Sequence, residues 1–329
     1  MSEAKRRPPY YLGIDLGGTA IKSGVVDDEG RPLSSVELPT EAVRGPDIGL
    51  RNMAEAARRA VAESGLEWEE IAGVGLGSPG DMDLPAGILL NPPNLPGWDN
   101  LPIRDRLAEL LGTPVAFQND ANAAAFGEFW VGAGRDVDSM AMYTLGTGIG
   151  CGIIDHGRII SGQHSHGSEC GHMIIQAIGG REHPPGYFGR LEAYASATAL
   201  VLRATEAIEA GEKTTLASAL VSGGLTAKLI DDHGKAGDPL AARLMKETAY
   251  FLAVGAVSLM HTIDPDVVLY GGGMIASGPA FLEEIRANIK KMAFPVPAAK
   301  TRVEYAQLGS DAGFIGAAGW AREVRRTAG

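Results

Sequence analysis

A glycine turn beside a carboxylate offers the first recognisable chemistry in this sequence. Asp15 stands near the end of an apolar run, Gly17, Gly18 and Thr19 follow it, and Lys22 lies three residues beyond. Backbone N–H groups in such a turn can bind phosphate oxygens, and Asp15 could hold Mg2+ through a water molecule. The segment is typical of a site for a metal-bound polyphosphate. A plain tight hairpin in which the aspartate caps the turn would show the same residues.

A second segment repeats this arrangement later in the chain. Residues 16–19 lead to residues 24–27, and residues 145–148 lead to residues 152–155, each time from a glycine turn to an apolar run that ends in aspartate. The second turn contains Gly146, Thr147 and Gly148. The repeat predicts two structurally similar halves whose glycine turns face one another across a cleft. It also favours phosphate binding over a plain hairpin at both turns.

A third glycine cluster, Gly271-Gly272-Gly273, follows a buried-strand pattern. Its flat backbone could pack against a nucleotide base, and an ordinary strand-to-helix turn is an equal alternative. The common nucleotide signatures are missing, because the chain has no Gly-x-x-x-x-Gly-Lys-Ser/Thr. One Gly-x-Gly-x-x-Gly occurs at residues 75–80, but residues 81–85 after it do not resemble a helix. The sequence therefore argues against a P-loop and against a dinucleotide-binding fold.

Strands and helices must position these turns, and their patterns alternate along the chain. Strands are predicted at Tyr10–Asp15, Ala20–Asp27, Arg31–Leu38, Ile71–Gly77, Val115–Gln118, Ser139–Leu145 and Asp266–Tyr270. Helices are predicted at Asp47–Ser64, Ile103–Leu111, Asp120–Val131, Asp238–Ile263 and Asp311–Arg325. A long loop is expected to run from Gly77 through residues 91–98, and loops of that length are usually functional.

Length and composition limit the class of protein. At 329 residues and 34.3 kDa the chain suits two domains, and its 45% hydrophobic and 21% charged residues are ordinary for a globular protein. The net charge of -11 argues against nucleic acid as the main partner. The longest apolar stretch, Phe251–Met260, is too short to span a membrane.

The N-terminal residues and the cysteines indicate the cellular compartment of the protein. Residues 1–9 are basic and contain prolines, without the apolar core of a secretion signal. Cys151 and Cys170 are too few for a disulfide framework. We therefore expect a cytoplasmic protein.

Six motifs in order make the chain resemble the ROK family of sugar kinases, within the actin-like and hexokinase-like ATPases, and in particular the glucokinases of that family. The resemblance covers nearly the whole chain. The motifs are Asp15–Thr19, Asn119–Ala125 with Gly127-Glu128, Leu145–Gly150, Glu169–Met173, Leu191–Ser196 and Tyr270–Gly273.

The resemblance implies an α/β fold of two domains, of the actin-like and hexokinase-like (ribonuclease H-like) ATPase type, with a cleft between the domains. Residues 1–118 would form a small α/β domain, completed by a C-terminal helix at 312–329. Residues 119–311 would form a large α/β domain. The family suggests a homodimer or a homotetramer.

The resemblance also assigns the reacting residue. Asp120 matches the catalytic base of the family, which would accept the proton of the sugar 6-hydroxyl as that oxygen attacks the γ-phosphorus of ATP. An aspartate that only caps the following helix is an alternative from the residues alone.

Further positions match the ligands of the sugar. Asn119, Glu169, His172 and Glu192 match groups that bind sugar hydroxyls. Pro79, Gly80 and Asn94 lie in loops that border the sugar in similar kinases. Carboxylates, an amide and an imidazole suit hydroxyls that both donate and accept hydrogen bonds. A structural ion pair is the alternative for each isolated Glu or His.

The nucleotide would bind with Mg2+, which Asp15 would hold through water. The residues expected to contact ATP are Asp15, Gly17, Gly18, Thr19, Lys22, Gly146, Thr147, Gly148, Gly272 and Gly273.

The chain departs from the family at one motif. Members usually carry Cys-x-Cys-Gly-x-x-Gly-Cys between the His and the Leu-Glu pair, and these cysteines with the His bind a structural zinc ion. Here His183, Pro185 and Arg190 stand at the cysteine positions, while Gly186 and Gly189 are kept. A tetrahedral zinc site needs four ligands, so we expect no zinc.

Other residues would then have to hold this loop. Packing of Pro184, Pro185, Tyr187 and Phe188 is the expected substitute. Scattered histidines, including His164 and His166, could form a different metal site, although such histidines are more often solvated.

The function implied is an ATP:hexose 6-phosphotransferase, with glucose as the first candidate and mannose, fructose or an N-acetylhexosamine as alternatives. Polyphosphate could replace ATP as donor. A sugar-responsive repressor is disfavoured, because about a dozen residues precede Gly13 and the net charge is acidic. A sugar sensor without activity is disfavoured by the presence of Asp15 and Asp120. The expected partner is a hexose, with no nucleic acid and no membrane.

Overall fold

The computed structural model describes residues 8–328. The basic opening residues 1–7, on which the expectation about a secretion signal mainly rests, lie outside the described residues. Contacts divide the chain into two compact units. The first comprises Met1–Asp136, Gly152–Ser168 and Gln307–Gly329, and the second comprises Val137–Cys151 and Glu169–Ala306. The domain boundary near residue 119 stays a prediction.

The first unit is built on a five-stranded sheet with the order β3-β2-β1-β4-β7. Its strands are β1 (Tyr10–Leu16), β2 (Ala20–Val26), β3 (Val36–Pro39), β4 (Ile71–Ser78) and β7 (Val115–Asn119). The first three form an antiparallel meander, and β4 and β7 continue parallel to β1. Parallel β1, β4 and β7 bring their carboxyl ends to one edge, where Asp15 and Asn119 lie.

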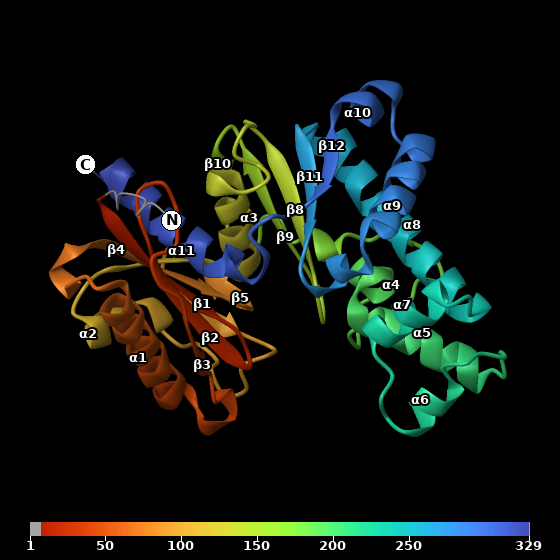
Figure 1. The fold of residues 1–329 in the computed structure, drawn as a ribbon, viewed down its shortest axis with the longest axis horizontal. Helices are drawn as coiled ribbons and strands as arrows, with labels where there is room; N and C mark the ends of the chain where they lie inside the picture. Colours follow the sequence, from red (N-terminus) through yellow and green to blue (C-terminus); the bar gives the residue numbers. More distant parts are fainter. Residues whose placement is uncertain (1–7, 329) are drawn as a thin grey trace, which may run out of the picture. The chain divides into compact units, whose positions relative to one another are not determined.

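Helices cover both faces of this sheet (Figure 1). Leu12 and Ile14 of β1 pack in a core with α1 (Pro46–Ser64) and α2 (Ile103–Leu111). Tyr11, directly before Leu12 in sequence, packs against α11 (Ala312–Ala328) on the other face. The alternation follows from the two-residue period of a strand. α11 also packs against α3 (Asp120–Val131).

Glycines let α11 lie directly on the sheet. A Cβ atom at Gly13 of β1 would overlap the carbonyl of Phe314, and one at Gly75 of β4 would overlap the carbonyl of Ala317. At both positions the strand backbone contacts the helix backbone. Helix α11 therefore packs closer to the sheet than it could if these two positions had side chains.

A second five-stranded sheet has the order β10-β9-β8-β11-β12. Its strands are β8 (Met140–Leu145), β9 (Ile149–Asp155), β10 (Arg158–Ile159), β11 (Val267–Gly271) and β12 (Arg302–Tyr305). Strands β11 and β12 run parallel to β8, as β4 and β7 do to β1. The two sheets thus share one strand order, which supports the internal repeat predicted from residues 16–27 and 145–155.

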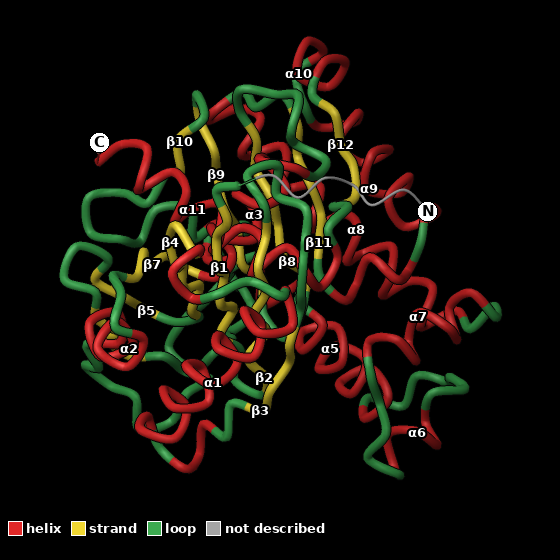
Figure 2. Tube along the Cα trace, turned by 60° about the vertical axis from the view of Figure 1, so that its left-hand side comes forward, coloured by secondary structure: helices red, strands yellow, loops and turns green. Residues whose placement is uncertain are grey.

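Helices make up most of the second unit (Figure 2). They are α4 (Glu192–Ala195), α5 (Ala197–Glu209), α6 (Ala217–Val221), α7 (Ala227–Lys235), α8 (Pro239–Ile263), α9 (Pro279–Met292) and α10 (Pro295–Lys300). Helix α8 begins after Asp238, whose carboxylate accepts the Ala241 N–H at 3.0 Å. It packs against α5, α7 and α9.

Two expectations from the sequence were wrong in detail. The strand predicted at Arg31–Leu38 is ordered as a strand only at Val36–Pro39, and Pro32 forms a single isolated bridge. Proline cannot donate a hydrogen bond to a neighbouring strand. The long loop expected after residue 77 contains a small hairpin of β5 (Asp81–Asp83) and β6 (Ile88–Asn91).

The approach of α11 predicts a difference between two glycines of the same strand. Gly75→Ala is expected to lower the free energy of unfolding by about 3 kcal/mol, because the added methyl group meets helix backbone that cannot move aside. Gly73→Ala is the matched control, since its Cβ would meet its nearest atoms at an ordinary 3.5 Å. Urea unfolding of both variants measures the difference, and equal midpoints would contradict it.

Candidate active site

The Asp15 carboxylate lies near the end of β1, where Asp15 pairs with Lys22 of β2 and Gly77 of β4. It rests against the first turn of α11, because a Cβ at Gly313 would overlap it. Burial and the negative charge of Asp120 raise the pKa of Asp15 to about 7, while Lys22 opposes the shift. A carboxylate in these surroundings is stabilised by a bound cation.

Lys22, predicted to bind phosphate, is already paired. Its ammonium group donates to Ser310 Oγ at 3.0 Å and lies 2.5 Å from Asp311 Oδ1. Lys22 must therefore exchange or share these partners to reach a phosphate. Only the lysine itself was singled out from the sequence, because its partners lie almost three hundred residues away.

Glu128 holds the segment that carries these partners. Its buried carboxylate accepts the N–H groups of Gln307 at 2.9 Å and Leu308 at 2.6 Å with one oxygen, and the N–H of Ala133 at 2.8 Å with the other. Sequence reasoning noted Glu128 within a motif and missed this role. The contact fixes the chain just before Ser310 and Asp311.

The turn at residues 17–19 is a closed hairpin. The Gly17 N–H donates to the Ala20 carbonyl at 2.9 Å, and Thr40 donates through its hydroxyl to the Gly17 carbonyl at 2.6 Å. Gly18 faces another predicted site residue, since a Cβ there would stand 2.9 Å from the carbonyl oxygen of Asn94. The structure thus brings Asn94 to the first glycine turn.

Pro79 and Gly80 lie directly after β4. Gly80 has a φ of 97°, and a Cβ there would stand 2.6 Å from Cα of Pro92. A side chain at Gly80 would push apart the two strand ends of the β5–β6 hairpin.

Asn119 and Asp120 stand at the junction of β7 and α3. The Asn119 side chain accepts the Asn122 N–H at 3.1 Å and so caps the helix. The interpretation of Asp120 as the cap was wrong. Asp120 is the first helical residue, and its carboxylate accepts the Ala121 N–H at 2.7 Å. Burial raises the pKa of Asp120, although backbone hydrogen bonds to its carboxylate oppose the shift.

In the second unit, a predicted sugar ligand touches the second glycine turn. Glu192, at the start of α4, accepts the Ile149 N–H at 2.7 Å. A Cβ at Gly148 would overlap the Glu192 carboxylate. The Gly146 N–H donates to the Gly148 carbonyl at 3.0 Å and closes the turn. Gly148 therefore leaves room for the Glu192 carboxylate beside the turn.

Glu169 directly precedes a short 3-10 turn at Cys170–His172, and His172 is the last residue of that turn. Nε2 of His172 lies 3.9 Å from Oε2 of Glu169. On the other side of the ring, Nη1 of Arg190 lies 3.0 Å from Nδ1 of His172. The sequence placed Arg190 at a lost cysteine position and gave no sign of this contact.

A pocket of about 320 Å³ opens within the second unit. It includes the predicted residues Gly146, Thr147 and Gly273. Gly272, with a φ of 83°, packs against the backbone of Leu145 beside it. The volume lies in the range of small-molecule sites. Lining residues that the sequence analysis did not identify are Ala197, Leu200, Thr226, Ala227, Lys228, Asp231, Asp232, Met245, Met274, Ala276 and Ser277.

The site residues fit Mg2+ and fit zinc poorly. Among residues 8–328, no group of three or more His, Cys, Asp or Glu side chains could hold a metal ion by itself. Mg2+ is usually held by one or two carboxylates together with substrate phosphates, a role that Asp15 fits. Zinc fits poorly, because it needs four protein ligands and the guanidinium of Arg190 stands beside His172.

The family described as "ROK family" matches residues 11–324. A glucokinase of Halalkalibacterium halodurans is 34% identical over 312 residues, 94% of this chain and 94% of that protein.

Two solved structures are similar over almost their full length. A ROK hexokinase from Thermus thermophilus is 34% identical with a TM-score of 0.84, covering 97% of this chain and 99% of its own. A ROK family glucokinase from Streptomyces griseus, in complex with glucose and AMPPNP, is 32% identical with a TM-score of 0.79, covering 95% and 99%. The α/β fold of the hexokinase-like ATPases is thereby confirmed. Within residues 8–328, no helix has both the length and the apolar character to cross a membrane.

The raised pKa of Asp15 predicts a change in stability with pH. Its folded pKa of about 7 exceeds the ordinary value of 3.8, so the ionised carboxylate destabilises the folded state increasingly as the pH rises from about 4 to about 7. Asp15→Asn should raise the free energy of unfolding by on the order of 2 kcal/mol at pH 8, and by less at pH 5. Urea unfolding at both values measures this.

The control for Asp15→Asn is Asp155→Asn, a more exposed carboxylate after the second glycine turn. This variant should unfold like the natural protein at both pH values. A stability of Asp15→Asn that equals or falls below that of the natural protein at pH 8 would contradict the prediction.

Proposed function

The chain belongs to the ROK family, and on this basis we propose that it transfers the γ-phosphoryl group of ATP to the 6-hydroxyl of a hexose, with glucose as the preferred sugar. Sugar kinase activity is supported by the glucokinase and hexokinase relatives over nearly the whole chain. The observation that carries the finer proposal is the half-buried Asp120 carboxylate at the start of α3, whose pKa is raised.

Asp120 is the proposed general base. Asn119 caps the helix, so the Asp120 carboxylate is not needed for that purpose. Its raised pKa brings its basicity closer to neutral pH, which suits a group that takes up a proton during the reaction. In this proposal the carboxylate accepts the proton of the sugar hydroxyl while the hydroxyl oxygen attacks the γ-phosphorus.

Glu169, His172 and Glu192 are proposed to bind the other hydroxyl groups of the sugar, together with Asn119. Glu192 already accepts one backbone N–H, and its carboxylate has further acceptor capacity for a hydroxyl. His172 lies beside Glu169, so an imidazole and a carboxylate can bind adjacent hydroxyls. These contacts would orient the 6-hydroxyl and add to binding without adding net charge from the substrate.

The phosphate donor is proposed to use both glycine turns. Gly17, Gly18 and Thr19 in the first unit, and Gly146, Thr147 and Gly148 in the second, offer backbone groups to phosphate oxygens. The pocket beside Gly273 has a volume suitable for the nucleoside. Asp15 would hold Mg2+, which when bound neutralises phosphate charge.

The alternatives to this proposal concern the identity of the sugar and of the phosphate donor. Mannose, fructose and N-acetylhexosamines carry hydroxyls that the same ligands could bind, and polyphosphate could use the same turns. The cytoplasmic location and a homodimer or homotetramer remain expectations from the sequence.

A coupled assay of ADP release tests the proposal. Glucose, mannose, fructose, N-acetylglucosamine and N-acetylmannosamine are supplied with ATP and Mg2+, and glucose is expected to give the highest kcat/KM. Turnover of an N-acetylated sugar alone would contradict glucose as the substrate but would support the proposed phosphoryl transfer. Absence of turnover with every sugar, in folded protein that binds glucose, would favour a sugar sensor.

The base is tested by Asp120→Asn, which keeps the shape of the side chain. The kcat is expected to fall by about 10²–10⁴-fold, because general base catalysis contributes this much, while glucose binding changes little. Asp105→Asn is the matched control, because it replaces an exposed aspartate in the first turn of α2. A kcat for Asp120→Asn within a few fold of the natural enzyme would exclude Asp120 as the base.

A further inference from the structure

The loop at residues 173–190 joins two of the proposed sugar ligands, since His172 precedes it and Glu192 follows it closely. Its backbone folds back on itself. The Leu191 N–H donates to the Met173 carbonyl at 2.9 Å, and the Ile175 N–H donates to the Gly189 carbonyl at 2.8 Å. The two ends of the loop therefore run side by side, and the placement of His172 depends on how the loop is held.

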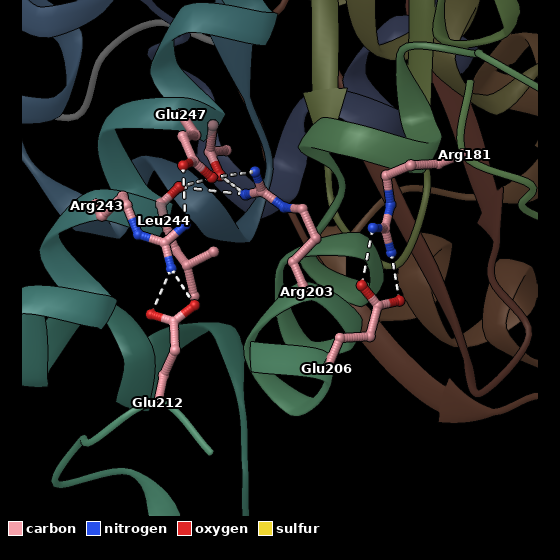
Figure 3. Close-up of polar contacts among 8 residues, drawn as sticks. Arg181, Arg203, Glu206, Glu212, Arg243, Leu244 and Glu247 are labelled. Atoms are coloured by element: carbon pink, nitrogen blue, oxygen red, sulfur yellow. Dashed lines mark hydrogen bonds and ion pairs between the residues drawn. The ribbon is translucent and has the colours of Figure 1, made fainter. Parts of the chain in front are cut away.

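Arg181 ties the outer part of the loop to the helices of the second unit. Its guanidinium forms two hydrogen bonds with Glu206 of α5, at 2.8 and 2.6 Å, and its backbone N–H donates to the Tyr194 hydroxyl at 2.7 Å. Figure 3 shows the two side chains facing each other. Paired hydrogen bonds of this kind are stronger and more directional than single ones.

Helix α5 is itself held by a buried arginine. Arg203 donates to the Thr248 hydroxyl at 2.5 Å and to the Leu244 carbonyl at 3.2 Å, and it lies 3.3 Å from Glu247, all on α8 (Figure 3). Only 7% of Arg203 is exposed. The loop is thus connected through α5 to the longest helix of the second unit.

Arg190 acts at the inner end of the loop. Its guanidinium lies over the ring of Tyr187, 3.6 Å from the ring centroid, and its Nη1 lies 3.0 Å from Nδ1 of His172. The guanidinium of arginine can donate hydrogen bonds but cannot accept them. Nδ1 of His172 must therefore accept this hydrogen bond, and it carries no proton. The imidazole then keeps its proton on Nε2, the nitrogen nearer to Glu169.

The same contact disfavours zinc at this place. Arg190 stands at one of the cysteine positions of the family motif, and a metal ion at Nδ1 of His172 would meet a fixed positive charge. The other two positions hold His183 and Pro185. In the part of the chain that the structure describes, no set of three potential ligands gathers here.

We propose that Arg190 is a positioning residue that takes the place of the metal, stacking on Tyr187 and holding His172 as the tautomer with its proton on Nε2. His172 then donates through Nε2 to a sugar hydroxyl. The effect on sugar binding rests on the proposed function, whereas the tautomer and the absence of a metal requirement do not.

Nitrogen-15 NMR of the histidine side chains tests the tautomer directly. At pH 8 the natural protein should show His172 with a protonated Nε2 and an unprotonated Nδ1, assigned by its loss in His172→Gln. Arg190→Met should give a mixture of both tautomers. Arg190→Lys keeps a donor without the planar stack, and it should restore the Nε2 proton in part.

Steady-state kinetics test the consequence for the sugar. Arg190→Met should raise the KM for glucose by about 10–100-fold, the range found when a group that orients a metal-binding histidine is lost, with the KM for ATP little changed. Arg190→Lys should lie between this variant and the natural enzyme.

Arg181→Met is the matched control, because it breaks the attachment to Glu206 and leaves the contact between Arg190 and His172. It should lower the thermal unfolding temperature without changing the tautomer. An Arg190→Met variant with the natural tautomer, or an Arg181→Met variant with the same change in KM, would overturn the proposal.

Elemental analysis tests the metal. After dialysis against EDTA and return to Mg2+, the natural protein should contain far less than one zinc per chain and keep its KM for glucose. Zinc bound one to one, whose removal raises this KM, would overturn the proposal. If no sugar is phosphorylated by any preparation, the proposed function fails, while NMR and elemental analysis still decide the role of Arg190.

Discussion

Backbone contact between α11 and the first sheet determines where the carboxylates of Asp15 and Asp120 lie. Gly13 and Gly75 let the helix rest on β1 and β4, and this places the first turn of α11 against the Asp15 carboxylate. The same helix packs against α3, which begins with Asp120. Because both carboxylates are positioned from one helix, their mutual repulsion is built into the fold and contributes to the raised pKa of Asp15.

Several side chains in this protein serve both to hold backbone and to present a chemical group. Glu192 binds the backbone of the second glycine turn and is also a proposed sugar ligand. Asn119 caps α3 and stands beside the proposed base. In the proposed function, such sharing would link the binding of sugar to the geometry of the glycine turns, because a shift of one carboxylate or amide moves the neighbouring backbone.

Much of this arrangement could be predicted from the sequence, where local pattern decides the structure. The limits of α3 follow from its alanines and from a polar residue before it, and the glycine turns follow from their spacing. Pro32, in contrast, stops a strand that hydrophobicity alone favours. The roles of Glu128 and Arg190 could not be predicted, because each depends on partners that only the folded chain brings near. The same holds for the pocket residues of α7, which look like ordinary helix surface in one sequence.

One face of the first sheet stays uncovered until the last helix is made. β4 ends at residue 78, and α11, which covers one face of that sheet, begins at residue 312. During synthesis at about 5–20 residues per second, this glycine-rich face stays uncovered for roughly ten seconds to a minute. The first unit therefore cannot complete its packing until the second unit has been translated. Folding of the first unit is therefore a late event, although most of its residues are translated first.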